Sequence, residues 1–423
     1  MTSEILPDTG THSREDDSSA LVLCIRNFAH IKFTYGCDVA EAVVEQVHLK
    51  ASEHIDCGWR AVIPQQGDGR ILVRRDFSRE IRSFSQNLEH EALLVQLGST
   101  PYIVDGTPIL VALSLSSEND RESTNVAPSN THLPLPEISR QAMAEAVEAF
   151  RALEENRLVV VWQPIRAIED GDVLYHEGLA RMRMAPDKPD FAAHSSFIPS
   201  IERLGLSRML DRSMVLEAIR LLQQGARGRL GCNISAQSAV CDAYWSMTFD
   251  LLAVDPSIAS RLVIEITESS EAADPESARE FTQRLRALGC QVAVDDFGFG
   301  YSSIARIAAL RPDIIKIDRQ FLKHARRRIF GNQFFSSLIA LSASMAAHVV
   351  VEGVEDEGDM KFAHTAGAQW VQGYYLGRPS VYDPANELPA SLLTTNEPHV
   401  KSSPRSSRRQ ISKKHFSVDL VEK

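Results

Sequence analysis

The sequence predicts a (β/α)8 barrel of the TIM type preceded by a smaller α/β domain. Eight short apolar segments recur between residues 159 and 376, and helix-length patterns lie between them. Alternating strands and helices indicate βαβ units and a parallel sheet. Eight such units in about 230 residues fit one closed barrel. Nearly every segment also ends in an acidic or amide residue, which predicts a common site at one end of that barrel.

The eight strands are expected where apolar residues cluster between polar stretches. They are VVVWQPI (159–165), VLYHEGL (173–179), LGCNIS (230–235), LVIEITE (262–268), QVAVDDF (291–297), IIKID (314–318), VVVEGV (349–354) and WVQGYYL (370–376). The helices between them include residues 209–224, 275–288, 302–310 and 334–347, and a further helix over 138–157 leads into the barrel.

The polar residues at the strand ends predict a cation site. They are Glu177, Asn233, Glu265, Asp295, Asp296, Lys316, Glu352 and Gln372. In a parallel barrel such residues meet at the C-terminal mouth. Two like charges about 4 Å apart repel by roughly 4 kcal/mol at an effective dielectric near 20, and Lys316 alone cannot balance five carboxylates. Either some carboxylates stay protonated or cations sit among them, and oxygen ligands without His or Cys favour Mg²⁺, Mn²⁺ or Ca²⁺ over Zn²⁺.

The chain divides by composition into five parts. Residues 1–19 and the basic tail, 389–423, are expected to be disordered, and 116–137 to be a linker rich in Ser, Asn, Thr and Pro. Residues 20–115 carry the smaller α/β pattern, with strands over 20–25, 59–63, 71–73 and 107–115 and helices over 39–55 and 79–97. Residues 138–388 are assigned to the barrel.

Composition excludes some function classes. The net charge of −11 argues against non-specific binding to DNA or RNA. No run of 18 apolar residues predicts a transmembrane helix, and the polar N-terminus has no signal-peptide core. The six cysteines contain no CxxC pair and are read as reduced thiols, so a cytoplasmic location is expected.

Several motifs together carry a family resemblance. They are QPI (163–165), EGL (177–179), CNISAQS (232–238), EITES (265–269), DDFGFGYSS (295–303), IKID (315–318), EGVE (352–355) and QGYYLGRP (372–379). In this order they resemble an EAL domain, a family that hydrolyses cyclic di-GMP to the linear dinucleotide pGpG with two divalent cations, Mg²⁺ or Mn²⁺. Metal ions of this kind acidify bound water and polarise a phosphodiester.

The resemblance implies roles for particular residues. The metal ligands would be Glu177, Asn233, Glu265, Asp295, Asp296 and Glu352. Lys316 would orient the attacking water, Glu355 would support this shell, and Glu268 would brace the DDFG loop. Substrate contacts would come from Gln163, Leu179, Arg181, Asp318 and Gln372.

Three departures from the family pattern carry expectations. Gly178 stands where the name motif has Ala, and a strand should tolerate this small residue. Met182 replaces an aromatic residue and removes a wall of the site. Phe299 stands where Thr is usual, from which we expect a change in rate and not a loss of activity.

The N-terminal domain shows a second, eroded resemblance. FAHIKFTYGCDVAEAVVEQV (28–47) is similar to part of a GGDEF domain, whose signature is reduced to QGDGR (66–70). Cys24 and Gly69 stand where that family has acidic residues, and Lys32 replaces its substrate Asn. This implies a degenerate, inactive cyclase domain with a role in sensing GTP, in dimerisation or in docking a protein partner.

Two rival functions remain open at this point. One is a non-catalytic cyclic di-GMP receptor that signals to a partner protein. The other is an enolase-like metal barrel acting on a carboxylate substrate. Release of pGpG that requires a metal ion separates these from a phosphodiesterase, which we expect to be a homodimer.

Overall fold

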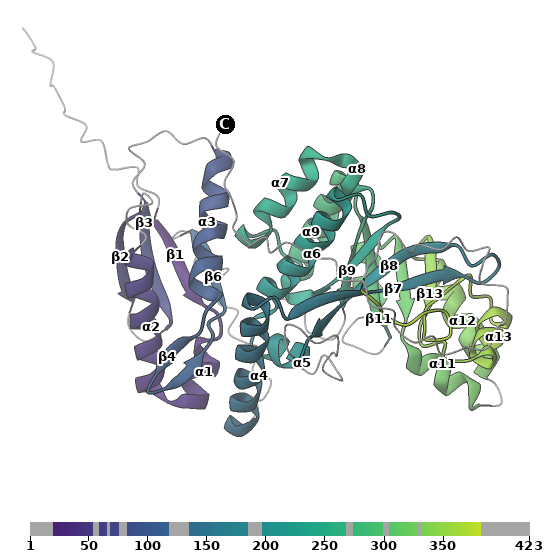
Figure 1. Cartoon of the computed structure of the whole chain (residues 1–423), viewed down its shortest axis with the longest axis horizontal. Helices are drawn as coiled ribbons and strands as arrows, with labels where there is room; N and C mark the ends of the chain where they lie inside the picture. The colour runs from purple at the N-terminus through teal and green to yellow at the C-terminus, as the bar shows by residue number, and fades with distance from the viewer. Residues whose placement is uncertain are drawn as a thin grey trace, which may run out of the picture. The chain divides into compact units, whose positions relative to one another are not determined.

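The computed structural model describes residues 20–53, 59–65, 68–75, 83–117, 135–184, 197–267, 274–298, 304–328 and 331–381. Its larger part is a closed barrel with strand order β10-β11-β12-β13-β14-β7-β8-β9, which confirms the expected eight-stranded architecture (Figure 1). The strands are β7 (Leu158–Ala167), β8 (Val173–Met182), β9 (Leu230–Ser235), β10 (Leu262–Thr267), β11 (Gln291–Phe297), β12 (Ile314–Ile317), β13 (His348–Val351) and β14 (Trp370–Val371).

One strand runs against the expected direction. β7 pairs antiparallel with both β8 and β14, whereas the other six pairs of neighbouring strands are parallel. The prediction of an all-parallel barrel is therefore wrong for β7. Only residues 168–172 join β7 to β8, and a parallel connection needs a crossover of about a dozen residues or more. The two strands consequently form a long hairpin, visible as the paired arrows in Figure 1.

Both sides of the barrel wall are covered, which explains the nearly continuous apolar strands. Inside the barrel, Ile165, Tyr175, Val263, Ile314 and Val350 belong to one buried cluster. Outside, the strands pack against helices to form the largest core cluster of the described residues. These helices are α6 (Ser207–Gln223), α7 (Ser246–Val254), α8 (Pro256–Ala259), α9 (Pro275–Leu288), α10 (Ile304–Leu310), α11 (Arg319–Arg326), α12 (Gly331–Ala343) and α13 (Glu357–Thr365).

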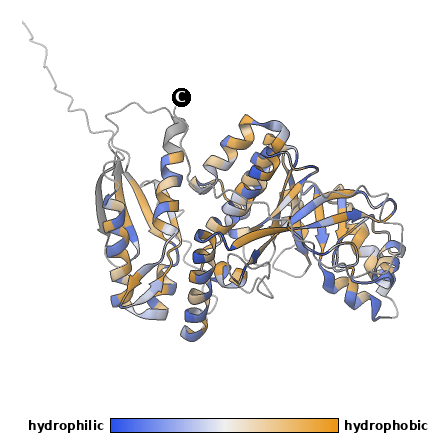
Figure 2. Ribbon diagram, viewed as in Figure 1, coloured by the Kyte–Doolittle hydropathy of each residue, from blue (hydrophilic) through white to orange (hydrophobic). Residues whose placement is uncertain are grey.

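Helix α9 illustrates how local sequence sets an element's bounds. Its first turn is capped by the Asp274 side chain, which accepts hydrogen bonds from the backbone N–H groups of Glu276 and Ser277. It ends at Gly289, whose φ of 101° is the left-handed conformation typical of a helix C-terminus. The buried residues of α9 recur every three or four positions, as in an amphipathic helix, and are Ala278, Phe281, Thr282 and Leu285. The helices around the barrel carry both hydrophilic and hydrophobic residues (Figure 2). The predicted helix over 275–288 is confirmed.

The N-terminal part is a smaller α/β unit built on an antiparallel sheet of order β2-β3-β1-β6. Its elements are β1 (Ala20–Ile25), α1 (Phe28–Tyr35), α2 (Cys37–Ser52), β2 (Trp59–Gln65), β3 (Arg70–Arg75), α3 (Ser83–Gly98), β4 (Tyr102–Val104), β5 (Thr107–Ile109) and β6 (Leu113–Ser117). Helix α1 was not among the expected elements. The predicted strand over 107–115 is two strands, because Asp105 and Gly106 form a turn with positive φ that pairs β5 with β4, while β6 pairs with β1.

The N-terminal unit and the first barrel helices share one hydrophobic core. Helices α4 (Pro136–Glu154) and α5 (Phe197–Arg203) lead into the barrel. Leu97 of α3, Met143 of α4 and Met209 of α6 are all buried in this cluster. A polar contact accompanies it, because the buried Glu91 of α3 pairs with Arg212 of α6 and accepts a hydrogen bond of 2.6 Å from the Met247 backbone N–H. Among the described helices, none is long and apolar enough to cross a membrane.

Candidate metal-binding and active site

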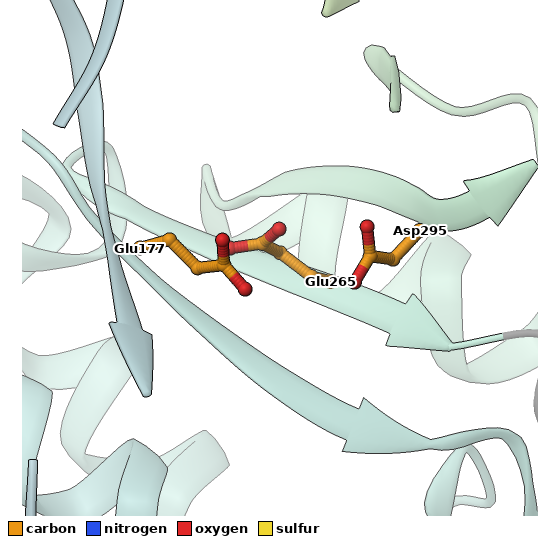
Figure 3. Close-up of side chains that lie close together, drawn as sticks. All are labelled: Glu177, Glu265 and Asp295. Atoms are coloured by element: carbon orange, nitrogen blue, oxygen red, sulfur yellow. The ribbon is translucent and has the colours of Figure 1, made fainter. Parts of the chain in front are cut away.

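The predicted strand-end residues meet at one mouth of the barrel. Glu177 lies on β8, Glu265 on β10 and Asp295 on β11, and their carboxylates face one another (Figure 3). One ligand oxygen from each of these three lies within 4.8 Å of the others. A second group within the same limit consists of Asp295, Asp296 and Glu352. The two groups therefore share Asp295.

A bulge in β11 turns both aspartates toward this mouth. Simple alternation would send neighbouring residues to opposite faces of the strand. However, the register with β12 shifts here: Val294 pairs with Ile315 and Phe297 with Ile317, so two aspartates stand opposite Lys316 alone. Asp296 is the extra residue of this bulge, and its φ is 56°. This is a left-handed conformation that Asp adopts more readily than most other residues.

Lys316 stands at the centre of the carboxylates. Its side chain is fully buried, and Nζ lies 3.1 Å from Glu177, 2.9 Å from Glu265, 2.9 Å from Asp295 and 2.8 Å from Glu352. Burial alone would lower the pKa of this ammonium, but attraction to the four carboxylates outweighs it and holds the pKa well above its usual value. Lys316 is therefore charged, and it neutralises one of the surrounding anions.

The buried Glu177 carboxylate accepts hydrogen bonds from two side-chain amides. Its Oε1 accepts a hydrogen bond of 2.5 Å from Asn233 Nδ2, and its Oε2 accepts one from Gln372 Nε2. Gln372 Nε2 also lies 3.3 Å from Gln163 Oε1, and Gln163 donates to the Gly377 carbonyl at 3.0 Å. Burial would raise the pKa of Glu177, yet Lys316 and these amide donors together hold it below its usual value.

The other carboxylates hold protons more tightly. Burial raises the pKa of Glu265 to about 8, and burial with repulsion from Asp295 raises the pKa of Asp296 to about 7. Burial also raises the pKa of Asp295, and that of Glu352 lies well above its usual value. Protonation and Lys316 therefore both reduce the repulsion that the sequence predicts for this rim.

The donor atoms fit hard divalent cations. Within the described part of the chain, Asn233 Oδ1 and Glu265 Oε1 are buried without a hydrogen-bond partner, although buried polar atoms are nearly always satisfied. All ligand atoms are carboxylate or amide oxygens, the set preferred by Mg²⁺, Mn²⁺ and Ca²⁺. Glu177, Glu265 and Asp295 could hold one ion, and Asp295, Asp296 and Glu352 a second.

Some of the remaining predicted site residues lie in or near the cluster, and others do not. Gln163 and Gln372 join the Glu177 network, and Leu179 and Arg181 are half-buried on β8 beyond Glu177. Asp318 follows β12, and its carboxylate caps α11 by accepting from Gln320 N–H at 2.8 Å. The structure does not bring Glu355 into the cluster, because this exposed side chain pairs with Lys323 at 3.0 Å. Glu268 and Phe299 lie outside the described residues.

Two aromatic side chains lie near the site: Trp162, which the sequence favours as a packing residue of the barrel, and Tyr175, whose role was not foreseen. Trp162 of β7 packs against Gly178, where an added Cβ would lie 2.8 Å from the indole ring, so an alanine here would require the ring to shift. Tyr175 of β8 donates a hydrogen bond to Glu265, with its oxygen 3.1 Å from Oε2. The spacing of two residues between Tyr175 and Glu177 was the available signal, because alternate strand residues face the same side.

The fold and the site together define an α/β-barrel protein with a buried acidic cluster suited to divalent cations. Residues 146–379 match the EAL domain family. The chain therefore belongs to this family, as the motifs of its strand ends predict.

Two relatives of this chain have names that state an activity. The chain is 32% identical over 244 residues to the cyclic di-GMP phosphodiesterase PdeF of Escherichia coli, a match covering 56% of this chain and 32% of the relative. It is 30% identical over 250 residues to the bifunctional diguanylate cyclase/cyclic di-GMP phosphodiesterase MucR of Pseudomonas aeruginosa, covering 57% of this chain and 35% of MucR. The chain thus spans about a third of the length of these two relatives.

A solved structure supports the fold alone. The EAL enzyme Bd1971, described in a cAMP-bound form, aligns with a TM-score of 0.50 and 22% sequence identity. The alignment covers 67% of this chain and 81% of that one.

Proposed function

We propose that this protein hydrolyses cyclic di-GMP to pGpG with two divalent cations, Mg²⁺ or Mn²⁺. The observation that carries the proposal is the pair of acidic groups joined at Asp295. Membership of the EAL family and the activities for which PdeF and MucR are named support the choice of substrate. Bound divalent cations would supply Lewis acidity and make a water molecule more nucleophilic at neutral pH.

The chain's own residues would hold and orient the reactants. Lys316 contacts all of the central carboxylates except Asp296 and is placed to stabilise the negative charge that develops when water attacks phosphorus. The new bond joins the water oxygen to phosphorus, and the ester bond to the 3′ oxygen breaks. The product keeps a 5′ phosphate, and the leaving 3′ oxygen takes up a proton. Arg181, half-buried on the same strand as Glu177, is our candidate for pairing with the second phosphate.

The first prediction tests this activity directly. Purified protein incubated with cyclic di-GMP and Mg²⁺ or Mn²⁺ should release pGpG, measured by chromatography. Glu177→Ala removes a carboxylate held by two amide donors and should lower the rate by orders of magnitude. The matched control is Glu276→Ala on α9, an exposed glutamate that should leave the rate unchanged.

Two results would contradict the proposal. If no pGpG forms with either metal at high enzyme concentration, but cyclic di-GMP binds, the barrel is a receptor. If the rate is the same in the presence of a chelator, the reaction does not use the acidic cluster as a metal site.

We infer that the N-terminal unit does not make cyclic di-GMP. Cys24 on β1 is buried, and it offers a neutral thiol because burial raises its pKa. At Gly69 an added Cβ would lie 2.6 Å from the Phe28 side chain, so that ring already occupies the space a side chain would need. Without carboxylates at these two positions there is no acidic pair for metal-bound GTP. The contacts of α3 with α6 favour a regulatory role for this unit.

A further inference from the structure

Tyr175 lies directly beneath the acidic cluster. It stands on β8 two residues before Glu177, so both side chains face the barrel interior. Its side chain is fully buried and belongs to the interior cluster with Val263, Ala293 and Ile314. The phenol O–H donates a hydrogen bond to Glu265 Oε2 over 3.1 Å. A single polar group thus reaches from the apolar interior of the barrel to a carboxylate of its mouth.

The neighbouring strand leaves space for this arrangement. Gly231 of β9 pairs with Glu177 of β8 and Val263 of β10. A Cβ at Gly231 would lie 2.5 Å from the Tyr175 ring and 2.4 Å from Glu265 Oε1. Both distances are shorter than real contacts allow, and the Tyr175 side chain is fully buried. Only glycine at this position lets the tyrosine ring and the glutamate carboxylate lie side by side.

The two oxygens of Glu265 are consequently in different situations. Oε2 accepts from Tyr175 and lies 2.9 Å from Lys316 Nζ. Within the described residues, Oε1 is buried and has no hydrogen-bond partner. Tyr175 and Lys316 therefore both contact Oε2. These two contacts fix the orientation of a carboxylate that offers a ligand atom within 4.8 Å of those of Glu177 and Asp295.

We propose that Tyr175 is a positioning residue that holds the Glu265 carboxylate in the orientation in which it completes the divalent-cation site formed with Glu177 and Asp295. This inference rests on the metal-binding part of the proposed function. It assigns Gly231 a supporting role as the position that makes room for the tyrosine. Hydrogen bonds of this kind to ligating side chains commonly change metal affinity by about 10- to 100-fold.

The test measures Mn²⁺ binding to the full chain without substrate, by electron paramagnetic resonance of the free ion. Tyr175→Phe keeps the ring that fills the space beside Gly231 and removes only the hydroxyl. We expect Mn²⁺ affinity to fall about 10- to 100-fold. The matched control is Tyr102→Phe, which also removes a buried hydroxyl, one that donates to the Leu97 carbonyl in the N-terminal unit. The control should leave Mn²⁺ affinity unchanged.

A double-mutant cycle distinguishes positioning from a general structural role. If Tyr175 acts through Glu265, then adding Tyr175→Phe to Glu265→Gln should change Mn²⁺ affinity much less than it does in the wild-type protein. The proposal is overturned if Tyr175→Phe binds Mn²⁺ as the wild type does, or if its effect is as large in the Glu265→Gln background. Loss of thermal stability without loss of Mn²⁺ affinity would make the hydroxyl purely structural.

Failure of this inference and failure of the proposed function give different results. If the wild type hydrolyses cyclic di-GMP but Tyr175→Phe keeps its Mn²⁺ affinity, only the positioning role is wrong. If the wild type does not hydrolyse cyclic di-GMP while Tyr175→Phe loses Mn²⁺ affinity, the positioning role stands and the phosphodiesterase does not.

Discussion

At the scale of single residues, the barrel mouth is governed by competition among protons, one ammonium group and divalent cations. Lys316 contacts four carboxylates within about 3 Å. A buried charge of this kind is stable only with such partners. Glu177 is held ionised by Lys316 and by amide donors, whereas burial favours protonation of Glu265 and Asp296. Binding of a cation must therefore displace protons from particular residues.

Lys316→Ala should separate binding from turnover. Its ammonium is fully buried among carboxylates and is not needed to hold a nucleotide outside the cluster. We therefore expect cyclic di-GMP affinity, measured by calorimetry, to be retained while the rate of pGpG release is lost. An equal loss of affinity and rate would instead identify Lys316 as a substrate clamp.

The affinity for Mn²⁺ should rise with pH in the metal-free protein. Glu265, with its pKa raised to about 8, and Asp296, with its pKa raised to about 7, each hold a proton below those values, and a cation must displace it. Affinity should thus increase between pH 6 and pH 8, on the order of tenfold per pH unit for each proton displaced. Titration of Mn²⁺ at several pH values measures the slope. Glu265→Gln removes one of the two protons and should flatten it; an unchanged slope would show that Glu265 does not bind the ion.

At the scale of elements, the β7–β8 hairpin and the β11 bulge place the site residues. The antiparallel hairpin aligns Gln163 with Glu177 and Trp162 with Gly178. The first pair brings Gln163 into the amide network around Glu177. The second pair places the Trp162 indole ring against Gly178 of β8, the strand that also carries Glu177. The bulge adds Asp296 to the mouth. The hairpin and the bulge each place side chains at the site that regular parallel strands would place elsewhere.

Gly178→Ala should destabilise the barrel although alanine is a small residue. The added methyl group would lie 2.8 Å from the Trp162 ring and 3.0 Å from the Gly231 carbonyl. Overpacking of this kind costs roughly 1–3 kcal/mol, which urea denaturation can measure. The control is Gly98→Ala at the end of α3, where the nearest atom is the flexible Met209 sulfur at 3.3 Å. A Gly178→Ala protein as stable as the control would mean that Trp162 can move aside.

At the scale of the whole molecule, the N-terminal unit contributes to the core that supports the barrel. Met143 and Met209 are buried together with Leu97 of α3. The same α6 that pairs with Glu91 through Arg212 carries Asp211, whose buried carboxylate accepts from the Ser235 backbone N–H at 2.9 Å and Ser238 Oγ at 2.5 Å. Ser235 ends β9, the strand of Asn233. Helix α6 therefore contacts both the N-terminal unit and the end of a site strand.

Deletion of residues 1–130 should change the behaviour of the barrel without abolishing its chemistry. It exposes apolar residues of α4 and α6, so we expect a lower melting temperature and an altered rate of pGpG release or an altered oligomeric state. Light scattering tests whether the full chain is the homodimer that we propose. Incubating the full chain with GTP should yield no cyclic di-GMP. The rate of pGpG release with and without added GTP tests whether GTP is an effector of the barrel.

Two outcomes would contradict this picture. A truncated protein with the same rate, stability, assembly and response to GTP as the full chain would remove the regulatory role. Synthesis of cyclic di-GMP from GTP would show that Cys24 and Gly69 do not prevent cyclase chemistry.

The sequence by itself determined the order and approximate positions of the strands and the kind of chemistry at their ends. The segments predicted as strands over 349–354 and 370–376 are longer than the observed strands, which end at Val351 and Val371. Alternating apolar segments and helices predict the barrel, and local capping residues such as Asp274 and Gly289 set the bounds of α9. The residue types at the strand ends predict an acidic, oxygen-ligand site, because a closed barrel gathers the ends of its strands at one mouth. These features depend only on residues close together in the sequence and on the gathering of strand ends at one mouth of a closed barrel.

Only the tertiary structure decided how those residues meet. The direction of β7, the bulge that turns Asp296 inward, the space at Gly231 for Tyr175 and the pairing of Glu355 with Lys323 were not foreseen. Each depends on register or on side-chain volume between segments far apart in the chain. Period-2 alternation fixes which side of a strand a residue faces, but it does not fix which residue of another strand lies opposite, and that pairing determines the contacts of the site.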